Sequence, residues 1–548
     1  MIAFLDVFLA YWIFLGALLV VAILGISLRK EIAQWIRQTT LTRKDWLILS
    51  LLFIITTTAL VEFVPFRPRT QSDESLYLAM AQNMSHNNMS GMCEEAIYTQ
   101  HGLDCIVEGH TFKGKLWSFV LSAVLPYFTE PASAVHVLQL LLWFLAWLFL
   151  FLSISSWTKK PLLALFSCAL LFSQPLTLQV FASGGNEPIY LTLWFLSLYI
   201  LRWVYDSPST KNIALLGIIL AFWFQTRQET FVDLPAFLFV LALAKPIRQS
   251  PRLIFSFSIP FLIVFSPMIL NLIHFHNFDL QSGNIPVRGH FIENILIASH
   301  RIFFPPYEQW FILLGILSAI VLATKAIRAK EYRGLLLFLA LSLLPAATIF
   351  EHISGDMSID SNHRYAVTWF PVLAFCFAWG ITQFRFWITA KSWLTSLASI
   401  SIVILSLGMG YKALVYDFPY ATQDILREQR AFRDFLAKNP DARKALFIYT
   451  RPSHFSGDGV SSIYVGSVAR PDNTIYLEAI KKWTGIKYFV WGYECQGKAT
   501  SHAKIQLIEL RPICEEALSH LTIEPVAESS GGITLFKISS IRNSSEHL

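Results

Sequence analysis

Two adjacent carboxylates, Asp73 and Glu74, follow an apolar stretch that is long enough to cross a membrane. A carboxylate at the boundary between lipid and water can take a proton from a hydroxyl or an amine, or it can bind a metal ion. It can also stabilise the first turn of a helix that Ser72 caps, because the helix dipole favours negative charge there. The local pattern leaves both interpretations open.

Four basic side chains form a second group that could take part in a reaction or bind a charged substrate. They are Lys113, Lys115, Arg227 and Arg364, and the topology predicted below places all of them on the external side. Arginine can bind phosphate through a two-pronged set of donors, and lysine acts on it as a point charge. The alternative is that each residue anchors the chain to lipid phosphates at the membrane surface.

Two loops contain residue types that bind metals. One holds Glu108 and His110, and the other, residues 351–364, holds His352 and Asp356. Such side chains can bind a divalent metal ion, or they can belong to an ordinary solvated loop. The cysteines form two further groups: Cys93 with Cys105, and Cys495 with Cys514. Each group could form a disulfide in an oxidising compartment, or it could remain as free thiols.

The composition of the chain indicates which elements must position these residues. Hydrophobic residues make up 54% of the 548 residues and charged residues only 15%, whereas a soluble domain usually carries about 25% charged residues. Residues 417–548 hold 31 of the 80 charged side chains. This distribution argues against a soluble enzyme and predicts a polytopic membrane domain followed by a soluble domain.

About twelve apolar stretches predict transmembrane helices, because helix is the open-ended structure that lipid permits. They occupy residues 3–27, 46–64, 132–154, 161–181, 187–204, 212–225, 229–245, 253–272, 308–324, 333–350, 365–383 and 394–415. Basic residues gather in every second connection, which predicts an external N-terminus and gives no indication of nucleic-acid binding. Residues 116–128 are too few to span a bilayer, so we expect a surface helix within an external loop of residues 65–131.

The residues that follow position 415 predict a small external α/β domain. Helices are expected at residues 422–438 and 474–485, and strands at residues 445–450, 486–492 and 532–538. The expected organisation has three parts. Residues 1–45 form an additional first span and a basic cytoplasmic loop, residues 46–415 form the membrane domain with the long external loop, and residues 416–548 form the external domain.

The motifs of the external loops resemble those of a known family. Asp73, Glu74, Tyr77 and Ala81 match the D-E-x-x-Y-x-x-x-A pattern of lipid-dependent glycosyltransferases of the GT-C fold, specifically the group of protein mannosyltransferases and lipid A aminoarabinose transferases. Lys113-Gly114-Lys115-Leu116-Trp117 is similar to the family's K-P-P-L-Y element, although both prolines are absent. Asn186-Glu187-Pro188 and Arg364-Tyr365 are similar to two further motifs. The resemblance spans most of residues 46–548.

The resemblance implies an inverting transfer of a sugar from a polyprenyl-phosphate donor to a lipid, glycan or protein acceptor. The reaction would take place at the external face of a bacterial inner membrane. Asp73 would be the general base beside Glu74. The implied contacts to the donor phosphate are Lys113, Lys115, Arg227, Arg364 and Tyr365, and those to the acceptor are Tyr77, Asn186, Glu187 and His363. Some relatives use a divalent metal and others need none.

Two other classes of protein compete with this hypothesis. A transporter or flippase of lipid-linked saccharides would also be a polytopic membrane protein, but such proteins tend to show paired halves and charges in the middle of the membrane. Here the candidate residues gather at one face, and no internal repeat is evident. A catalytically silent scaffold, whose external domain binds a partner, is the third alternative.

Overall fold

The computed structural model describes most of the chain. The described residues are 2–37, 43–64, 72–99, 102–109, 114–227, 230, 234–243, 247, 250–282, 308–331, 367–384, 401, 404–408, 423–470, 474–496, 510–528 and 533–542. The predicted site residues Lys113, His110, His352, Asp356, His363, Arg364 and Tyr365 lie outside these ranges, as does the predicted span at 333–350.

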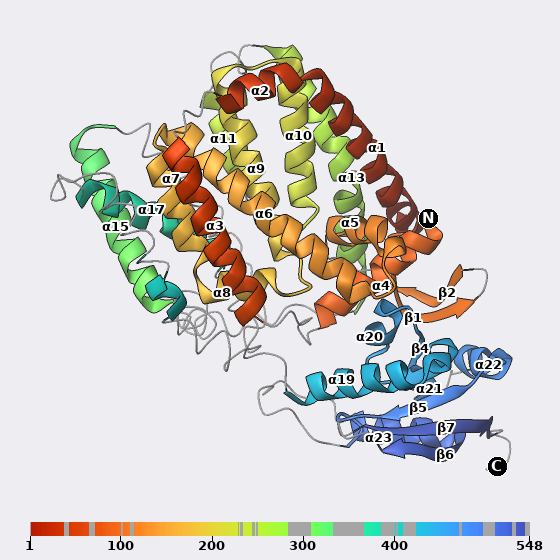
Figure 1. Ribbon diagram of the computed structural model, residues 1–548. Coiled ribbons are helices and arrows are strands. Elements are labelled where there is room, and N and C mark those ends of the chain that lie inside the picture. The colour runs from red at the N-terminus through yellow and green to blue at the C-terminus, as the bar shows by residue number, and fades with distance from the viewer. Residues whose placement is uncertain are drawn as a thin grey trace.

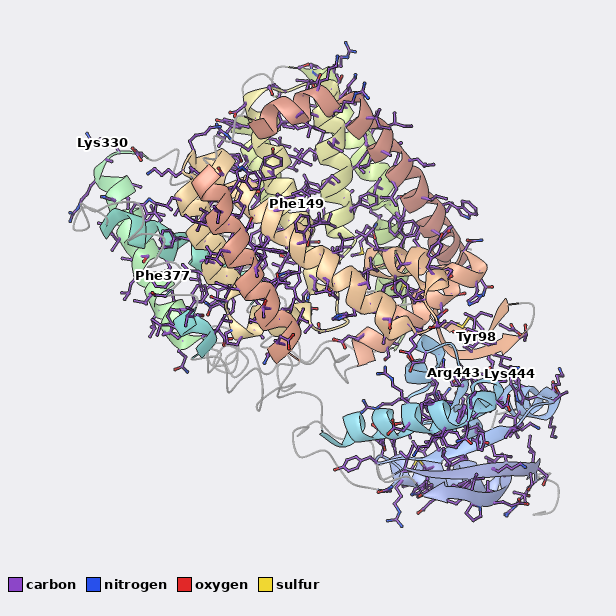
Figure 2. The ribbon with its side chains drawn as sticks, in the orientation of Figure 1. Tyr98, Phe149, Lys330, Phe377, Arg443 and Lys444 are labelled. Carbon is purple, nitrogen blue, oxygen red and sulfur yellow. A yellow bond between two sulfur atoms is a disulfide. The ribbon has the colours of Figure 1, made fainter. Side chains whose placement is uncertain are left out.

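The first part of the chain is a helical bundle (Figure 1). Its helices are α1 (Ile2–Ser27), α2 (Arg29–Arg37), α3 (Arg43–Phe63), α4 (Ser72–Asn87), α5 (Leu116–Val124), α6 (Pro131–Thr158), α7 (Pro161–Phe172), α8 (Pro175–Phe181), α9 (Glu187–Asp206), α10 (Thr210–Phe224), α11 (Leu234–Leu243), α13 (Pro251–Ser282), α15 (Gln309–Arg328) and α17 (Phe370–Phe384). Large aromatic side chains fill the space between them (Figure 2). Trp143 of α6, for example, packs edge-on against Phe172 and Phe181, with ring centroids 4.8 and 5.1 Å away.

Several described helices are apolar and long enough to cross a membrane. Five helices meet both criteria, or six if the bent pair α7 and α8 counts as one span. The long apolar segments are Leu9–Ser27, Pro131–Thr158, Glu187–Asp206, Pro251–Leu270 and Gln309–Arg328. The protein is therefore an integral membrane protein, but the predicted number of about twelve spans is not confirmed. The predicted spans at 46–64 and 212–225 form helices with shorter apolar segments, Trp46–Glu62 and Thr210–Phe224.

The predicted span at 161–181 is broken. Helices α7 and α8 meet at an angle of 75°, because Pro175 has no N–H to donate and disfavours helical backbone at the preceding residue. The buried carboxylate of Glu308 accepts a hydrogen bond from the backbone N–H of Leu176 at 2.9 Å. The backbone N–H groups in the first turn of a helix have no partner within the helix. The residue before α15 therefore provides a hydrogen-bond acceptor for one of them in α8.

Residues 116–128 form a short helix and a turn, and one face of the helix is buried in the protein. Helix α5 continues into a single 3-10 turn, η1 (Leu125–Tyr127). Trp117 and Leu121 are fully buried, and Ser118 donates a hydrogen bond to the backbone carbonyl of Tyr77 in α4 at 2.9 Å. The expected helix is therefore present and packs against α4, and its placement at a membrane surface stays a prediction.

The C-terminal domain is built on a mixed seven-stranded sheet of order β2-β1-β4-β3-β5-β7-β6. The strands are β1 (Met92–Thr99), β2 (Gly102–Gly109), β3 (Leu446–Tyr449), β4 (Ser461–Tyr464), β5 (Lys487–Trp491), β6 (Leu521–Glu528) and β7 (Thr534–Ile541). The accompanying helices are α19 (Gln423–Lys438), η5 (Pro440–Lys444), α20 (Pro452–Gly457), α21 (Val465–Ala469), α22 (Thr474–Lys482) and α23 (Leu510–Ser519). Strands β3, β4 and β5 are parallel, and the remaining pairings are antiparallel.

The predicted helices and strands of this domain are all present, and the structure adds a hairpin that the sequence analysis missed. Strands β1 and β2 come from the first long loop, more than 300 residues before the rest of the sheet, and they extend its edge through the pairing of Ala96 with Ser462. Cys93 and Cys105 form a disulfide within this hairpin, and Cys495 and Cys514 form another in the C-terminal domain. The N-terminus of α1 lies at the same end of the bundle as this domain, and α2 lies at the opposite end (Figure 1).

The buried carboxyl group of Glu428 in the C-terminal domain should make the stability of the protein depend on pH. Glu428 accepts hydrogen bonds from the Tyr449 hydroxyl, at 2.5 Å, and from the backbone N–H of Tyr493. Burial raises the pKa of Glu428 above its usual value near 4.5, and the two hydrogen bonds offset only part of this effect. The folded state therefore binds this proton more tightly than the unfolded chain does. The contribution of Glu428 to the free energy of unfolding falls as the pH rises from 4.5 through the raised pKa.

We expect Glu428→Gln to remove this contribution to the pH dependence. The stability of the variant relative to the wild type should increase as the pH is raised from 4 to 8. Thermal unfolding of both full-length proteins in detergent measures the difference. A difference in Tm that stays constant over this pH range would contradict the prediction.

Candidate active site

Four segments of the helical bundle converge at the end that faces the C-terminal domain (Figure 1). They are the first turns of α4, the Gly114-Lys115 turn before α5, the connection of residues 182–186 between α8 and α9, and residues 225–227 after α10. Six predicted site residues with described side chains lie in these segments or directly after them and are buried: Glu74, Tyr77, Lys115, Asn186, Glu187 and Arg227. The structure thus places residues that are far apart in sequence at one junction.

Helix α4 brings the acid pair to this junction. Asp73 is the second residue of the helix; the structure describes its backbone and not its side chain. Glu74 is 1% exposed and lies against the backbone of Gly184, where an added Cβ would be 3.5 Å from the Glu74 Cβ. Successive residues of a helix point about 100° apart. The two carboxylates of the motif therefore cannot occupy equivalent positions.

The connection between α8 and α9 is fixed by side chains from two other helices. The indole N–H of Trp117 donates to the carbonyl of Gly184 at 2.9 Å, and the amide of Gln139 in α6 donates to the carbonyl of Gly185 at 3.1 Å. Gly185 leaves room for the carboxylate of Glu187, which a Cβ at this position would strike. Glu187 and Pro188 occupy the first turn of α9, a location that favours both residue types.

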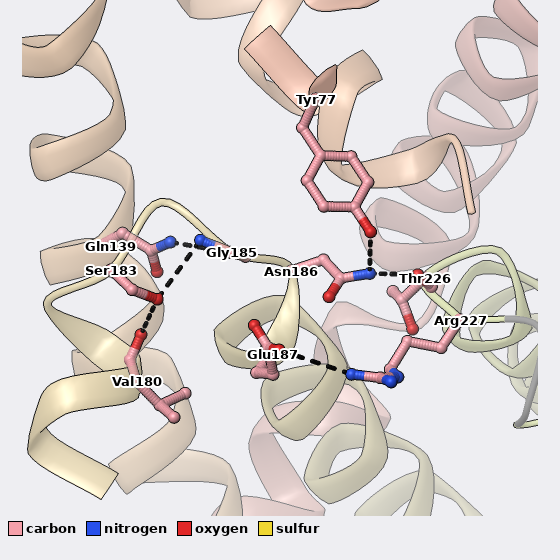
Figure 3. Close-up of polar contacts among 9 residues, drawn as sticks. All are labelled: Tyr77, Gln139, Val180, Ser183, Gly185, Asn186, Glu187, Thr226 and Arg227. Atoms are coloured by element: carbon pink, nitrogen blue, oxygen red, sulfur yellow. Dashed lines mark hydrogen bonds and ion pairs between the residues drawn. The ribbon is translucent and has the colours of Figure 1, made fainter. Parts of the chain in front are cut away.

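Asn186 links three of the four segments. Its side-chain amide donates to the hydroxyl of Tyr77 at 2.8 Å and to the backbone carbonyl of Thr226 at 2.6 Å (Figure 3). All three residues are buried. Tyr77 and Asn186, both predicted to contact the acceptor, therefore contact each other, and one amide holds α4, α9 and the end of α10 together.

Glu187 and Arg227 form an ion pair inside the protein. The guanidinium Nη1 lies 3.5 Å from the Glu187 Oε1, and the two side chains are 1% and 6% exposed (Figure 3). Moving a charged group from water into the protein costs free energy. Each buried charge of this pair is therefore stable only when its partner is present. A site containing such charges in a region of low dielectric can act strongly on a charged substrate.

Lys115 is the second buried cation, and Gly114 determines its position. The backbone N–H of Leu116 donates to the carbonyl of Gln225 at 3.3 Å, and Lys115 is 3% exposed. A Cβ on Gly114 would collide with the backbone of Gln225 and Thr226. Glycine allows this close approach of two backbone segments, which places Lys115 beside the segment that carries Arg227.

We expect Gly114→Ala to disturb this junction. The added methyl group should lower the free energy of unfolding by about 1–3 kcal/mol, because two backbone segments must separate to admit it. The measurement is thermal unfolding of the purified variant, with Gly16→Ala as the control. Gly16 has no atom within 4 Å of an added Cβ. Equal losses in the two variants would contradict the prediction.

The structure tests only part of the predicted site. Lys113, Arg364, Tyr365 and His363 lie outside the described residues, as do three of the four possible metal ligands, His110, His352 and Asp356. The fourth, Glu108, has a described backbone in β2 but no described side chain. Within the described part of the chain, no three His, Cys, Asp or Glu residues lie close enough to hold a metal ion.

Sequence reasoning overlooked two side chains that shape the junction. Gln139 is a buried amide in an otherwise apolar stretch of α6, and polar residues inside membrane spans often have a functional or structural partner. The position of a polar residue within a predicted span could therefore have identified Gln139 from the sequence. The role of Trp117 as a hydrogen-bond donor to Gly184 had no signal in the sequence, because an aromatic residue at a membrane boundary usually packs against lipid.

The helical bundle and the C-terminal α/β domain have the GT-C fold of membrane glycosyltransferases. The fold is similar to that of ArnT from Cupriavidus metallidurans, solved bound to undecaprenyl phosphate, with a TM-score of 0.52, 12% identity and coverage of 90% of this chain and 98% of that chain. The apo state of ArnT gives a TM-score of 0.51 at 12% identity and the same coverage. An oligosaccharyltransferase from Archaeoglobus fulgidus, tethered to an acceptor peptide, gives 0.48 at 11% identity and covers 90% and 74% of the two chains. No family model and no curated protein sequence matches the chain.

Proposed function

We propose that this protein is an inverting membrane glycosyltransferase that moves a sugar from a polyprenyl-phosphate donor to an acceptor at the external face. The observation that carries the proposal is the convergence of Glu74, Lys115, Asn186, Glu187 and Arg227 at one end of the bundle. Four of these residues, Glu74, Lys115, Asn186 and Glu187, belong to the motifs by which the sequence resembles lipid-dependent glycosyltransferases. The likeness in fold to ArnT supports the same class of protein.

The donor phosphate binds beside the buried cations. When the bond between the sugar and the phosphate breaks, negative charge develops on the departing polyprenyl phosphate. Lys115 and Arg227 offer positive charge in a region that excludes water, where such stabilisation is strong. Lys113, Arg364 and Tyr365 are proposed as further contacts to the phosphate.

Asp73 acts as the general base. It takes the proton from the hydroxyl or amine of the acceptor while the acceptor atom forms a bond to the anomeric carbon. The bond from that carbon to the polyprenyl phosphate breaks in the same displacement, so the configuration inverts. Glu74, buried against Gly184, fixes the start of α4. Tyr77, Asn186, Glu187 and His363 are proposed to face the acceptor. Glu108, His110, His352 and Asp356 are the candidate ligands for a divalent metal ion.

The test is a transfer assay with the purified protein in proteoliposomes. Each of a panel of polyprenyl-phosphate sugars is supplied with lipid, glycan and peptide acceptors, and the consumption of the donor is measured. We expect one donor to be consumed with release of polyprenyl phosphate. If folded protein leaves every donor of a broad panel intact, the proposal is wrong.

One observation favours the transporter as a second candidate. Transporters often use discontinuous helices, and α7 and α8 form a bent pair whose second helix is capped by the buried Glu308. The same proteoliposomes distinguish the two functions. Movement of intact labelled lipid to the opposite leaflet without loss of its sugar would identify a transporter.

A further inference from the structure

The C-terminal domain is joined to the first external loop through the sheet. Beyond the pairing of β1 with β4, the backbone N–H of Tyr98 donates to the Ser461 hydroxyl at 2.9 Å. The hydroxyl of Ser467 donates to the buried carboxylate of Glu95 at 2.6 Å. The hairpin that follows α4 is therefore an integral part of the C-terminal sheet.

Helix α20 of the C-terminal domain packs directly on α4. The side-chain amide of Gln82 in α4 donates to the carbonyl of Gly457 at 3.3 Å. A Cβ added to Gly457 would lie 3.0 Å from the Cβ of Leu78 and 3.5 Å from the carbonyl oxygen of Ser75, both in α4. Because Ser75 is two residues after Asp73, the contact lies within one turn of the proposed base.

Tyr98 connects the three elements of this junction. Its hydroxyl donates to the carbonyl of Ser456 in α20 at 2.6 Å, and its ring packs edge-on against His86 of α4 with the centroids 5.8 Å apart. Its backbone belongs to β1. The residue lies where the hairpin meets the C-terminal domain (Figure 2). A single side chain thus contacts α4 and α20 while its backbone forms part of the sheet.

We infer that the C-terminal domain is a working part of the transfer site: through Gly457 and Tyr98 it holds α4 in the position that aligns the acid pair with the loops carrying Lys115 and Arg227. Gly457 and Tyr98 are positioning residues, because neither is part of the proposed chemistry. The inference about catalysis rests on the proposed function, whereas the docking of α20 on α4 can be tested without it.

The primary variant is Gly457→Val, which inserts a side chain between α20 and α4. Its matched control is Gly25→Val in α1, where an added Cβ meets nothing within 4 Å. Tyr98→Phe is the milder second variant, because it removes one hydrogen bond and keeps the ring. The first readout is amide hydrogen exchange of residues 75–87, which reports on the order of α4 whether or not sugar is transferred.

We expect exchange in α4 to be at least tenfold faster in Gly457→Val, moderately faster in Tyr98→Phe and unchanged in Gly25→Val. In the transfer assay kcat should fall on the order of 10²-fold in Gly457→Val, since small misplacements of catalytic groups have effects of this size. KM for the donor should stay unchanged, because the proposed phosphate contacts lie on other segments. A purely structural defect would instead reduce the yield of folded protein and leave kcat per folded molecule unchanged.

Unchanged exchange in α4 of Gly457→Val, or an unchanged kcat per folded molecule in that variant, would overturn the inference. If exchange changes as expected but wild type consumes no donor, the proposed function fails and the docking role of the C-terminal domain stands.

Discussion

Replacing Asp73 with asparagine is expected to lower kcat for sugar transfer by about 10²- to 10⁴-fold, the usual contribution of a general base. Asparagine keeps the size of the side chain, so the variant should fold as the wild type does. The measurement is the initial rate of polyprenyl phosphate release from the donor identified in the panel, with thermal unfolding as the check on folding.

Asp434→Asn is the matched control for this experiment. Asp434 is an exposed acid on α19 in the C-terminal domain, so the same chemical change there should leave the rate unaltered. Wild-type rates in Asp73→Asn would exclude Asp73 as the base. Glu74→Gln is informative beside it, because the buried Glu74 lies against Gly184 and its replacement should lower stability as well as activity.

The second large effect is expected when the buried ion pair between Glu187 and Arg227 is broken. Arg227→Met removes the cation that lies 3.5 Å from Glu187 and leaves the carboxylate in a region of low dielectric. Breaking a buried pair in this way usually costs about 3–5 kcal/mol. We expect a clear fall in the free energy of unfolding, measured by denaturant or thermal unfolding in detergent, together with loss of transfer activity.

The double variant Arg227→Met/Glu187→Gln separates stability from function. Removing both charges eliminates the uncompensated carboxylate, so much of the lost stability should return. Transfer should remain low, because the cation proposed to stabilise the departing phosphate is still absent. Full stability in the single variant would show that the pair does not hold the junction, and full activity in the double variant would remove Arg227 from the phosphate site.

Much of the site was predictable because its residues lie in short local motifs. Asp73 and Glu74 after an apolar stretch, Lys115 before α5, and Glu187 at the start of α9 are each visible in the sequence. Their shared side of the membrane follows from the distribution of basic residues in the connections. The sequence could not show which of these residues contact one another. The hydrogen bonds of Asn186 to Tyr77 and Thr226 join residues 109 and 40 positions away.

The fold was harder to predict where distant segments pair or a helix breaks. Strand β1 extends the sheet through Ser461 and Ser462, more than 360 residues further along the chain, and no local pattern specifies such a partner. The external loop was therefore interpreted as a loop with a surface helix. Pro175 was visible in the apolar stretch 161–181, but the hydrogen bond from the Leu176 backbone N–H to Glu308 joins residues 132 positions apart, which no local pattern specifies.

The central claim is that the junction of α4, α5, α9 and α10 binds a polyprenyl phosphate for sugar transfer. An experimental map of the purified protein with undecaprenyl phosphate tests it most directly. The account predicts the phosphate within hydrogen-bonding distance of Lys115 and Arg227 and close to Asp73, with the prenyl chain passing beside α5. Density for the lipid at the opposite end of the bundle, near α2, with the junction empty at saturating lipid, would contradict it.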